Sequence, residues 1–131
     1  MEDSKIIPDD ERLIIESLCY YADNLKLDLV ITTGGTGLGP RDTTPDAMAK
    51  VIEREIPGIT EALRAYGQAR TPYSMLSRGI AGVRGRTIIV NLPGSKRAVA
   101  ESLDALFPGL FHAFVMLRGG EHPSNREQLE T

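Results

Sequence analysis

Hydrophobic positions divide the chain into helical and extended segments. Near the N-terminus, apolar residues recur at the spacing of one helix face, which predicts an amphipathic helix of about four turns. These residues are Leu13, Ile14, Leu18, Ala22 and Leu25. The pair Ile6-Ile7 ends at Pro8 and is followed by acidic residues, so we expect the end of a strand and then a helix start.

Residues 27–33 form a short, almost continuous apolar run, as is typical of a parallel strand buried on both faces. A glycine-rich loop follows this run. We expect the next helix to have Thr44 as its N-cap and Pro45 at its first position, and to end at Pro57-Gly58. A further helix is expected over residues 59–69.

The second half of the chain again places a loop and a helix after a strand. Residues 79–83 and 87–90 are predicted strands, joined by a hairpin turn at Arg84-Gly85. Ser95 is a suitable N-cap for the following helix, and Pro108 begins the last one. The apolar residues of that last helix are expected to pack inward: Leu110, Phe111, Phe114, Val115 and Leu117.

Together these elements predict an α/β fold, a three-layer α/β/α sandwich around a mostly parallel sheet. We expect one domain over residues 1–120 and a polar C-terminal tail over residues 121–131. Loops that follow parallel strands gather at one edge of such a sheet, and ligands bind there. The segments 33–42 and 91–96 are therefore the main candidates for a functional role.

Charge and cysteine content argue against several classes of function. The 131 residues carry a net charge of −3, which does not favour nucleic acid or an anionic membrane as a partner. The single cysteine, Cys19, excludes an intramolecular disulfide and a cysteine-based zinc cluster. The apolar runs are too short to cross a bilayer and the N-terminus does not resemble a signal peptide, so we expect a cytoplasmic protein.

The segment Thr33–Asp42 carries the strongest functional signal. Its glycines let backbone N–H groups approach a ligand and form an anion-binding concavity, and Thr33 and Thr36 add hydroxyl donors. Pro40 stands where a Walker loop has its lysine and where the dinucleotide-binding motif has its third glycine, which excludes both motifs. The alternative interpretation is a tight turn between a strand and a helix.

Asp9 and Asp42 are candidate acids. Asp42 follows the glycine loop, and a carboxylate beside bound phosphates is a natural ligand for Mg²⁺. Asp9 also lies between a predicted strand and a helix, so both carboxylates reach one edge of the sheet if their strands are neighbours. The alternatives are that Asp9 is a helix N-cap, and that Asp42 pairs with Arg41 or with the helix dipole.

The segment Asn91-Leu92-Pro93-Gly94-Ser95-Lys96 is a second loop suited to a ligand. Ser95 and the N–H groups after it present a helix N-terminus, which favours an anion. Ser77 and Arg78 precede a predicted strand and can reach the same edge. His112 and Cys19 are expected to be packed structural residues.

Taken together, these motifs resemble the molybdopterin-binding family of the MogA/MoaB type, which includes the G domain of gephyrin and its plant counterpart. The resemblance extends over residues 6–120 and preserves the order and spacing of the motifs. The matching stretches are Ile7-Pro8-Asp9-Asp10, Thr32–Asp42, Thr44-Pro45-Asp46, Pro57-Gly58, Leu76-Ser77-Arg78, Gly82-Val83-Arg84-Gly85 and Asn91–Ser95.

The resemblance implies a molybdopterin-binding fold that forms a homotrimer or a hexamer. It implies Mg²⁺-dependent transfer of AMP from ATP to the terminal phosphate of molybdopterin, and a molybdate insertase that receives the product. Asp9 and Asp42 correspond to the functional acids of the family and are the implied metal ligands. The implied binding residues are Thr33, Gly34, Gly35, Thr36, Gly37, Ser77, Asn91, Pro93, Gly94 and Ser95.

The chain departs from the family at its N-terminus. In the family, a strand, a helix and a second strand, with a Ser-Asp motif, precede the matched stretch, so the chain resembles an N-terminally truncated family domain. A non-catalytic module that binds molybdopterin is therefore an alternative to the adenylyltransferase. An insertase-type domain that loads molybdate is a third alternative, although its glycine loop usually differs after the third glycine.

Overall fold

The computed structural model describes residues 5–119. A π-helical turn, Tyr20–Asn24, continues the first helix, and a 3-10 turn, Ser74–Leu76, follows α3. The helices and strands are α1 (Glu11–Cys19), β1 (Leu29–Thr33), α2 (Thr44–Val51), β2 (Arg54–Glu55), α3 (Pro57–Gln68), β3 (Ala81–Arg84), β4 (Thr87–Leu92), α4 (Lys96–Leu106) and α5 (Gly109–Leu117). From the first helix onward the predicted order of helices and strands is confirmed, with the short strand β2 added.

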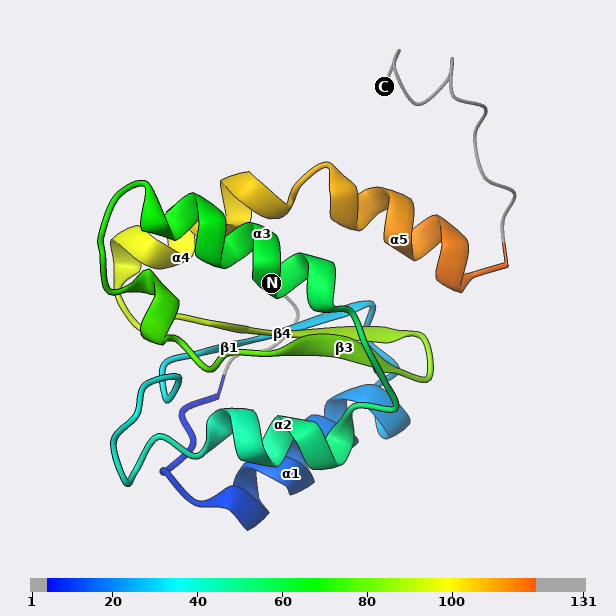
Figure 1. Ribbon diagram of the computed structural model, residues 1–131. Helices are drawn as coiled ribbons and strands as arrows, with labels where there is room; N and C mark the ends of the chain where they lie inside the picture. The colour runs from blue at the N-terminus through cyan, green and yellow to red at the C-terminus, as the bar shows by residue number, and fades with distance from the viewer. Residues whose placement is uncertain (1–4, 120–131) are drawn as a thin grey trace, which may run out of the picture.

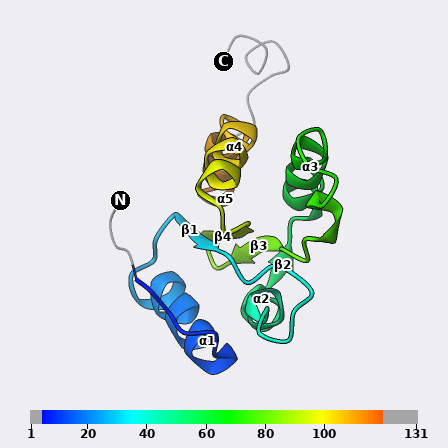
Figure 2. The ribbon, with the colours of Figure 1, turned by 90° about the vertical axis from the view of Figure 1, so that its left-hand side faces the viewer.

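Helices cover both faces of the sheet, which confirms the three-layer α/β/α sandwich. Figure 1 shows α1 and α2 on one face and α3, α4 and α5 on the other, and Figure 2 shows the same layers along the strands. All six residues of β4 are buried, and they alternate between the two layers. Ile89 packs toward α1 and α2, whereas Ile88 and Val90 pack toward α4 and α5.

The sheet has the strand order β1-β4-β3-β2. β1 runs parallel to β4, with Val30 opposite Ile89, whereas β3 pairs antiparallel with both β4 and β2. The sheet is therefore mixed, and the expected parallel arrangement is found only between β1 and β4. The reason is the predicted hairpin, in which Gly85 takes a φ of +59° and reverses the chain between β3 and β4.

The first helix begins at Glu11 because Asp10 acts as its N-cap. The Asp10 carboxylate accepts a hydrogen bond of 3.2 Å from the N–H of Leu13. Together with the π-helical turn, α1 covers the predicted length of about four turns. The strand end expected at Ile6-Ile7 is wrong, because a strand needs a hydrogen-bonded neighbour and Ile6 is 98% exposed.

Two predicted helix boundaries shift in the structure. The N-cap of α2 is Thr43 rather than Thr44, so Thr44 and Pro45 both lie in the first turn. Pro57 begins α3 instead of ending the preceding helix, because the fixed φ of proline suits a first helical turn. Between these helices the backbone N–H groups of Glu53 and Ile56 bond to β3, which forms β2.

The last two helices pack on the sheet through part of their apolar surface. Ser95 caps α4 as predicted, since its hydroxyl accepts a 3.1 Å hydrogen bond from the N–H of Ala98. In α5, Leu110 is buried, but Phe111 and Val115 are 61% and 44% exposed. The expectation that both pack inward is wrong, because they lie about one turn apart on the outer face of the helix.

Two further expectations concern the C-terminal tail and membrane-spanning segments. The predicted polar tail, residues 121–131, lies outside them. Within residues 5–119, no single helix is long and apolar enough to span a membrane, although α4 and α5 together, with a bend of 62°, meet the length and composition criteria.

Candidate functional site

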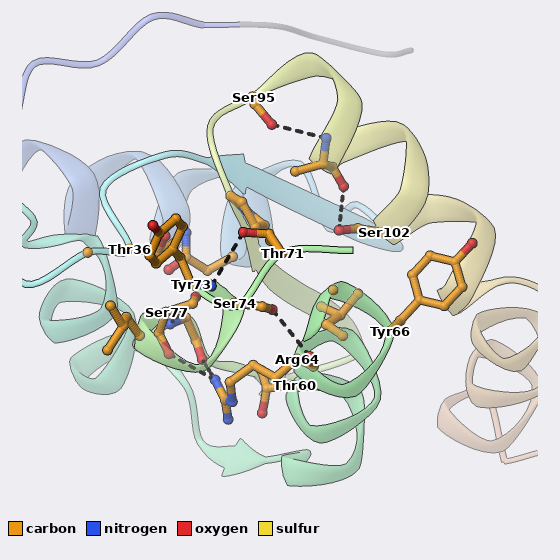
Figure 3. Close-up of a pocket in the computed structure, with 18 of the residues that line it drawn as sticks. Thr36, Thr60, Arg64, Tyr66, Thr71, Tyr73, Ser74, Ser77, Ser95 and Ser102 are labelled. Atoms are coloured by element: carbon orange, nitrogen blue, oxygen red, sulfur yellow. Dashed lines mark hydrogen bonds between the residues drawn. The ribbon is translucent and has the colours of Figure 1, made fainter. Parts of the chain in front are cut away.

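A cavity of about 460 Å³ lies where the parallel strands β1 and β4 end. Its wall is built by the loop after β1, by α3 and the segment after it, by the end of β4 and by α4. Figure 3 shows Thr36 and Ser77 on one side of this cavity and Tyr66 and Ser102 on the other. Six of the predicted binding residues line it: Thr36, Gly37, Ser77, Asn91, Pro93 and Ser95.

The other predicted binding residues, Thr33, Gly34, Gly35 and Gly94, do not line the cavity. Gly34 has a φ of +86° and donates a 2.9 Å hydrogen bond to the carbonyl oxygen of Leu92. A Cβ atom on Gly94 would lie 3.4 Å from the Cα atom of Gly34. The two predicted loops therefore touch through their backbones beside the cavity, and the positive φ of Gly34 favours glycine at that position.

Arg78 organises the glycine loop from a distant part of the chain. Its backbone N–H donates to Thr36, and its guanidinium donates to the carbonyl oxygens of Gly37, at 3.0 Å, and Asp42, at 2.5 Å. The same guanidinium forms an ion pair with Asp46 in the first turn of α2. The hydrogen bonds from Arg78 to the Asp46 carboxylate hold the pKa of Asp46 below its ordinary value of 3.8.

Asp42 closes the glycine loop on itself. Its Oδ2 atom accepts a 2.9 Å hydrogen bond from the N–H of Gly39. Cβ atoms on Gly37 and Gly39 would lie 2.8 and 2.9 Å from Oδ2, so both glycines allow this close approach. The alternative ion pair with Arg41 is wrong, and Oδ1 accepts no hydrogen bond from the described residues, which leaves that oxygen available to a ligand.

Asp9 is exposed just before α1, and it is not the N-cap, because Asp10 has that role. Figure 1 shows the start of α1 on the same side of the molecule as the loop after β1. Neither Asp9 nor Asp42 lines the cavity. Among residues 5–119, no three Asp, Glu, His or Cys side chains gather to hold a metal ion, so a Mg²⁺ site at Asp9 and Asp42 stays a prediction.

Asn91 ties the two parallel strands together at the floor of the cavity. It is 2% exposed, and its Nδ2 atom donates to the hydroxyl of Thr32 at 2.8 Å and to the carbonyl of Gly34 at 3.3 Å. Its Oδ1 atom is buried without a hydrogen-bond partner in the described part of the chain. An unsatisfied buried acceptor costs about 1–3 kcal/mol, so a donor that reached Oδ1 would be favoured.

Ser77 is positioned by a network that begins on α3. The Nη1 atom of Arg64 donates hydrogen bonds to the carbonyl oxygens of Ser77, at 3.3 Å, and Gly79, at 3.1 Å. The Ser77 hydroxyl accepts a 3.2 Å hydrogen bond from the N–H of Gly79. Arg64 therefore connects α3 to the segment that carries Ser77, and both residues line the cavity.

The sequence prediction missed the part of the site that the helices contribute: Thr60, Leu63, Arg64, Tyr66, Glu101 and Ser102. No local motif marks these positions, because they become a wall only when α3 and α4 pack side by side on one face of the sheet. One signal was available in Gly67, since a glycine inside a helix often marks a close contact. A Cβ atom there would lie 2.4 Å from the Ser74 hydroxyl.

Comparison with known proteins agrees with this geometry. Residues 1–112 match the protein family described as a probable molybdopterin binding domain. The chain is 36% identical over 126 residues to a molybdopterin adenylyltransferase of Helicobacter pylori, a match that covers 96% of this chain and 72% of that enzyme. It is 47% identical over 96 residues to a molybdenum cofactor biosynthesis bifunctional protein of Chlorobaculum tepidum, over 73% of this chain.

The chain spans only part of the length of these relatives, 31% for the bifunctional protein. Among solved structures, the molybdopterin biosynthesis enzyme MoaB from Thermus thermophilus is similar with a TM-score of 0.80 and 48% identity. That similarity covers 88% of this chain and 73% of the MoaB chain. Because the family match extends over most of the sequence and the fold agrees, the chain belongs to the family of probable molybdopterin binding domains.

Proposed function

We propose that the chain acts in molybdenum cofactor biosynthesis as an adenylyltransferase that transfers AMP from ATP to the terminal phosphate of molybdopterin. The observation that carries this proposal is the cavity at the ends of β1 and β4. It combines a glycine loop, Ser77 and the N-terminus of α4 in a chain of the molybdopterin-binding family. Relatives named molybdopterin adenylyltransferase support the choice of reaction.

The reaction needs no nucleophile from the protein. An oxygen of the terminal phosphate of molybdopterin attacks the α-phosphorus of ATP, and the bond to the leaving pyrophosphate breaks. The protein's task is to position both phosphates and to stabilise their charge. The backbone N–H groups of the loop at Thr36 and Gly37 and the N-terminus of α4 are suited to this task.

Asp42 and Asp9 are the proposed Mg²⁺ ligands. The donor set fits the ion, because Mg²⁺ takes one or two carboxylates and completes its shell with water and substrate phosphates. The Oδ1 atom of Asp42 is open while Oδ2 stays bonded to Gly39, and the Asp9 carboxylate is exposed. When bound, the ion would offset part of the negative charge of the nucleotide phosphates.

The decisive experiment is an adenylylation assay with molybdopterin, ATP and Mg²⁺. Asp42→Asn is the informative variant, because asparagine keeps an oxygen for the Gly39 N–H and removes the charge. We expect its turnover to fall about a hundredfold or more, while molybdopterin binding is retained. Asp104→Asn, an exposed carboxylate on α4, serves as the control and should leave turnover unchanged.

A non-catalytic molybdopterin-binding module is the second candidate. It is favoured by one observation, that neither Asp9 nor Asp42 lines the cavity. Molybdopterin binding without any adenylylated product would establish the module and reject the enzyme. Accumulation of adenylylated molybdopterin and pyrophosphate would reject the module.

We further propose a homotrimer or hexamer. Two exposed apolar side chains of α5, Phe111 and Val115, support it, because they lie one turn apart on the same face and exposed apolar patches often mark contact surfaces. Sedimentation equilibrium measures the mass directly. A monomer at micromolar concentrations would contradict the proposal.

A further inference from the structure

Glu101 and Arg64 are the charged side chains that line the cavity in the described part of the chain. Arg64 already donates to the carbonyl oxygens of Ser77 and Gly79. Glu101 lies six residues after the N-cap Ser95 on α4, which is about 9 Å along the helix axis. The cavity therefore has an anion-binding end at the loops and an acidic end between α3 and α4.

The carboxylate of Glu101 is held in place by two arginines. Its Oε1 atom lies 3.0 Å from Nε of Arg97 and 3.4 Å from Nε of Arg70. Arg70 is itself fixed, because it donates a 2.7 Å hydrogen bond to the carbonyl of Tyr66 and covers the Tyr66 ring at 3.6 Å. Neither arginine lines the cavity, whereas Glu101 and Tyr66 do.

The second carboxylate oxygen, Oε2, accepts no hydrogen bond from residues 5–119. The Glu101 side chain is only 25% exposed, compared with 84% for Arg97. A fixed, partly buried carboxylate that can only accept hydrogen bonds selects a partner with N–H donors. It disfavours a partner that presents a carbonyl or a ring nitrogen lone pair at the same place.

We propose that Glu101 recognises the amino-pyrimidinone edge of the pterin ring, which presents a 2-amino group beside a ring N–H. Adenine offers an amino group beside an unprotonated ring nitrogen, so it matches the carboxylate less well. The ring lies between α3 and α4, and the phosphate lies at the loop end of the cavity. This inference rests on the proposed function and adds the residue that selects the ring and sets its orientation.

The test compares two fluorescent probes that differ at one group. One is 6-hydroxymethylpterin phosphate, and the other is its lumazine counterpart, in which an oxo group replaces the 2-amino group. Fluorescence titration of the full chain should show that the pterin binds about tenfold or more tightly than the lumazine. In Glu101→Gln this preference should fall to about twofold or less, because the amide can donate to the oxo group.

Two control variants separate recognition from structural support. Asp104→Asn, on the exposed surface of α4, should keep the full preference for the pterin. Arg70→Ala removes an ion pair of Glu101 but leaves its carboxylate, so it should also keep the preference. The contrary outcome is that Arg70→Ala loses the preference for the pterin as completely as Glu101→Gln does. Glu101 would then act only by holding α3 against α4, and the proposal would be overturned.

The remaining outcomes distinguish this inference from the proposed function. If the unaltered chain adenylylates molybdopterin while Glu101→Gln keeps the full preference, this inference fails and the enzyme proposal stands. If Glu101→Gln weakens binding of AMP and leaves the pterin unaffected, the ring at Glu101 is adenine and the proposal is overturned. If the unaltered chain adenylylates molybdopterin but binds neither pteridine, this inference fails and the enzyme proposal stands. If it neither binds a pteridine nor adenylylates molybdopterin, both proposals fail.

Discussion

The guanidinium of Arg78 forms two hydrogen bonds, each 3.3 Å long, with the two carboxylate oxygens of Asp46. The same group bonds to the carbonyl oxygens of Gly37 and Asp42, so one side chain connects the glycine loop to the first turn of α2. The conformation of the loop thus depends on a residue 41 positions further along the chain than Gly37.

Replacement of Arg78 by alanine should destabilise the fold. The variant loses two charge-assisted hydrogen bonds to backbone carbonyls, and we expect the free energy of unfolding to fall by about 2 kcal/mol. Urea unfolding followed by circular dichroism measures this change. Arg86→Ala, at an exposed position beside the hairpin turn, should change it little. Equal losses in both variants would show that the Arg78 cluster does not stabilise the loop.

The ion pair between Arg78 and Asp46 should give stability a specific dependence on pH. Because the pKa of Asp46 is lowered in the folded chain, its ionised form stabilises the fold at pH values above the ordinary carboxyl value of 3.8. This contribution is lost as the pH falls through the lowered pKa. The difference in Tm between the unaltered chain and Asp46→Asn should therefore be present at pH 7 and vanish at strongly acidic pH.

The same comparison in an Arg78→Ala background provides the control. Hydrogen bonding to Arg78 is the largest cause of the lowered pKa, so Asp46→Asn should then have little effect at pH 7. A pH-dependent difference that persisted without Arg78 would assign the effect to another group.

Two glycines should respond in opposite directions to alanine. Gly35 has a φ of +69°, and a Cβ atom there would lie 2.3 Å from the Thr44 hydroxyl, so we expect Gly35→Ala to cost about 1–3 kcal/mol. Gly58 lies in the first turn of α3, where a Cβ atom would have no neighbour within 4 Å. Gly58→Ala should be neutral or stabilise by up to about 1 kcal/mol. Thermal unfolding of the two variants checks both expectations, and a stabilised Gly35→Ala would contradict the strained loop.

Gly67 and Ser74 should be energetically coupled. An alanine at position 67 would place its Cβ atom 2.4 Å from the Ser74 hydroxyl, which donates to the carbonyl of Arg64. Ser74→Ala removes that hydroxyl, so Gly67→Ala should cost less in its presence. We expect a coupling energy of about 1 kcal/mol in a double-mutant cycle measured by urea unfolding. If the stability losses of the two variants were strictly additive, the segment after α3 would move aside to make room for the Cβ atom, and the predicted coupling would be wrong.

The fold was predictable wherever a local signal decides the structure. Ser95 directly precedes a helical pattern of apolar residues, where an N-cap is expected, and it caps α4. Gly85 lies at the predicted hairpin turn. The strand β2 was not predictable from its own residues, Arg54 and Glu55, which are polar and exposed. It forms because Gly82 on β3 lets this segment approach, since a Cβ atom there would lie 2.6 Å from the Arg54 carbonyl oxygen.

The candidate site was predictable at its loops and not at its helices. The glycine loop and Ser77 carry motifs that can be recognised from spacing alone. Arg64 and Glu101 lie on amphipathic helices, where a charged residue indicates only an exposed face. Their position in the cavity follows from the packing of α3 beside α4, and sequence periodicity does not specify which helices become neighbours.

The central position of β4 has a consequence for how the cavity opens. Asn91 belongs to a strand that is hydrogen-bonded on both sides and buried along its whole length, so we expect its amide protons to be among the slowest in the domain to exchange with solvent. The cavity wall also includes Thr71 and Tyr73, which lie in an exposed segment where we expect local opening to cost much less free energy. We therefore expect a ligand to enter past Thr71 and Tyr73, while the strand that carries Asn91 keeps its geometry.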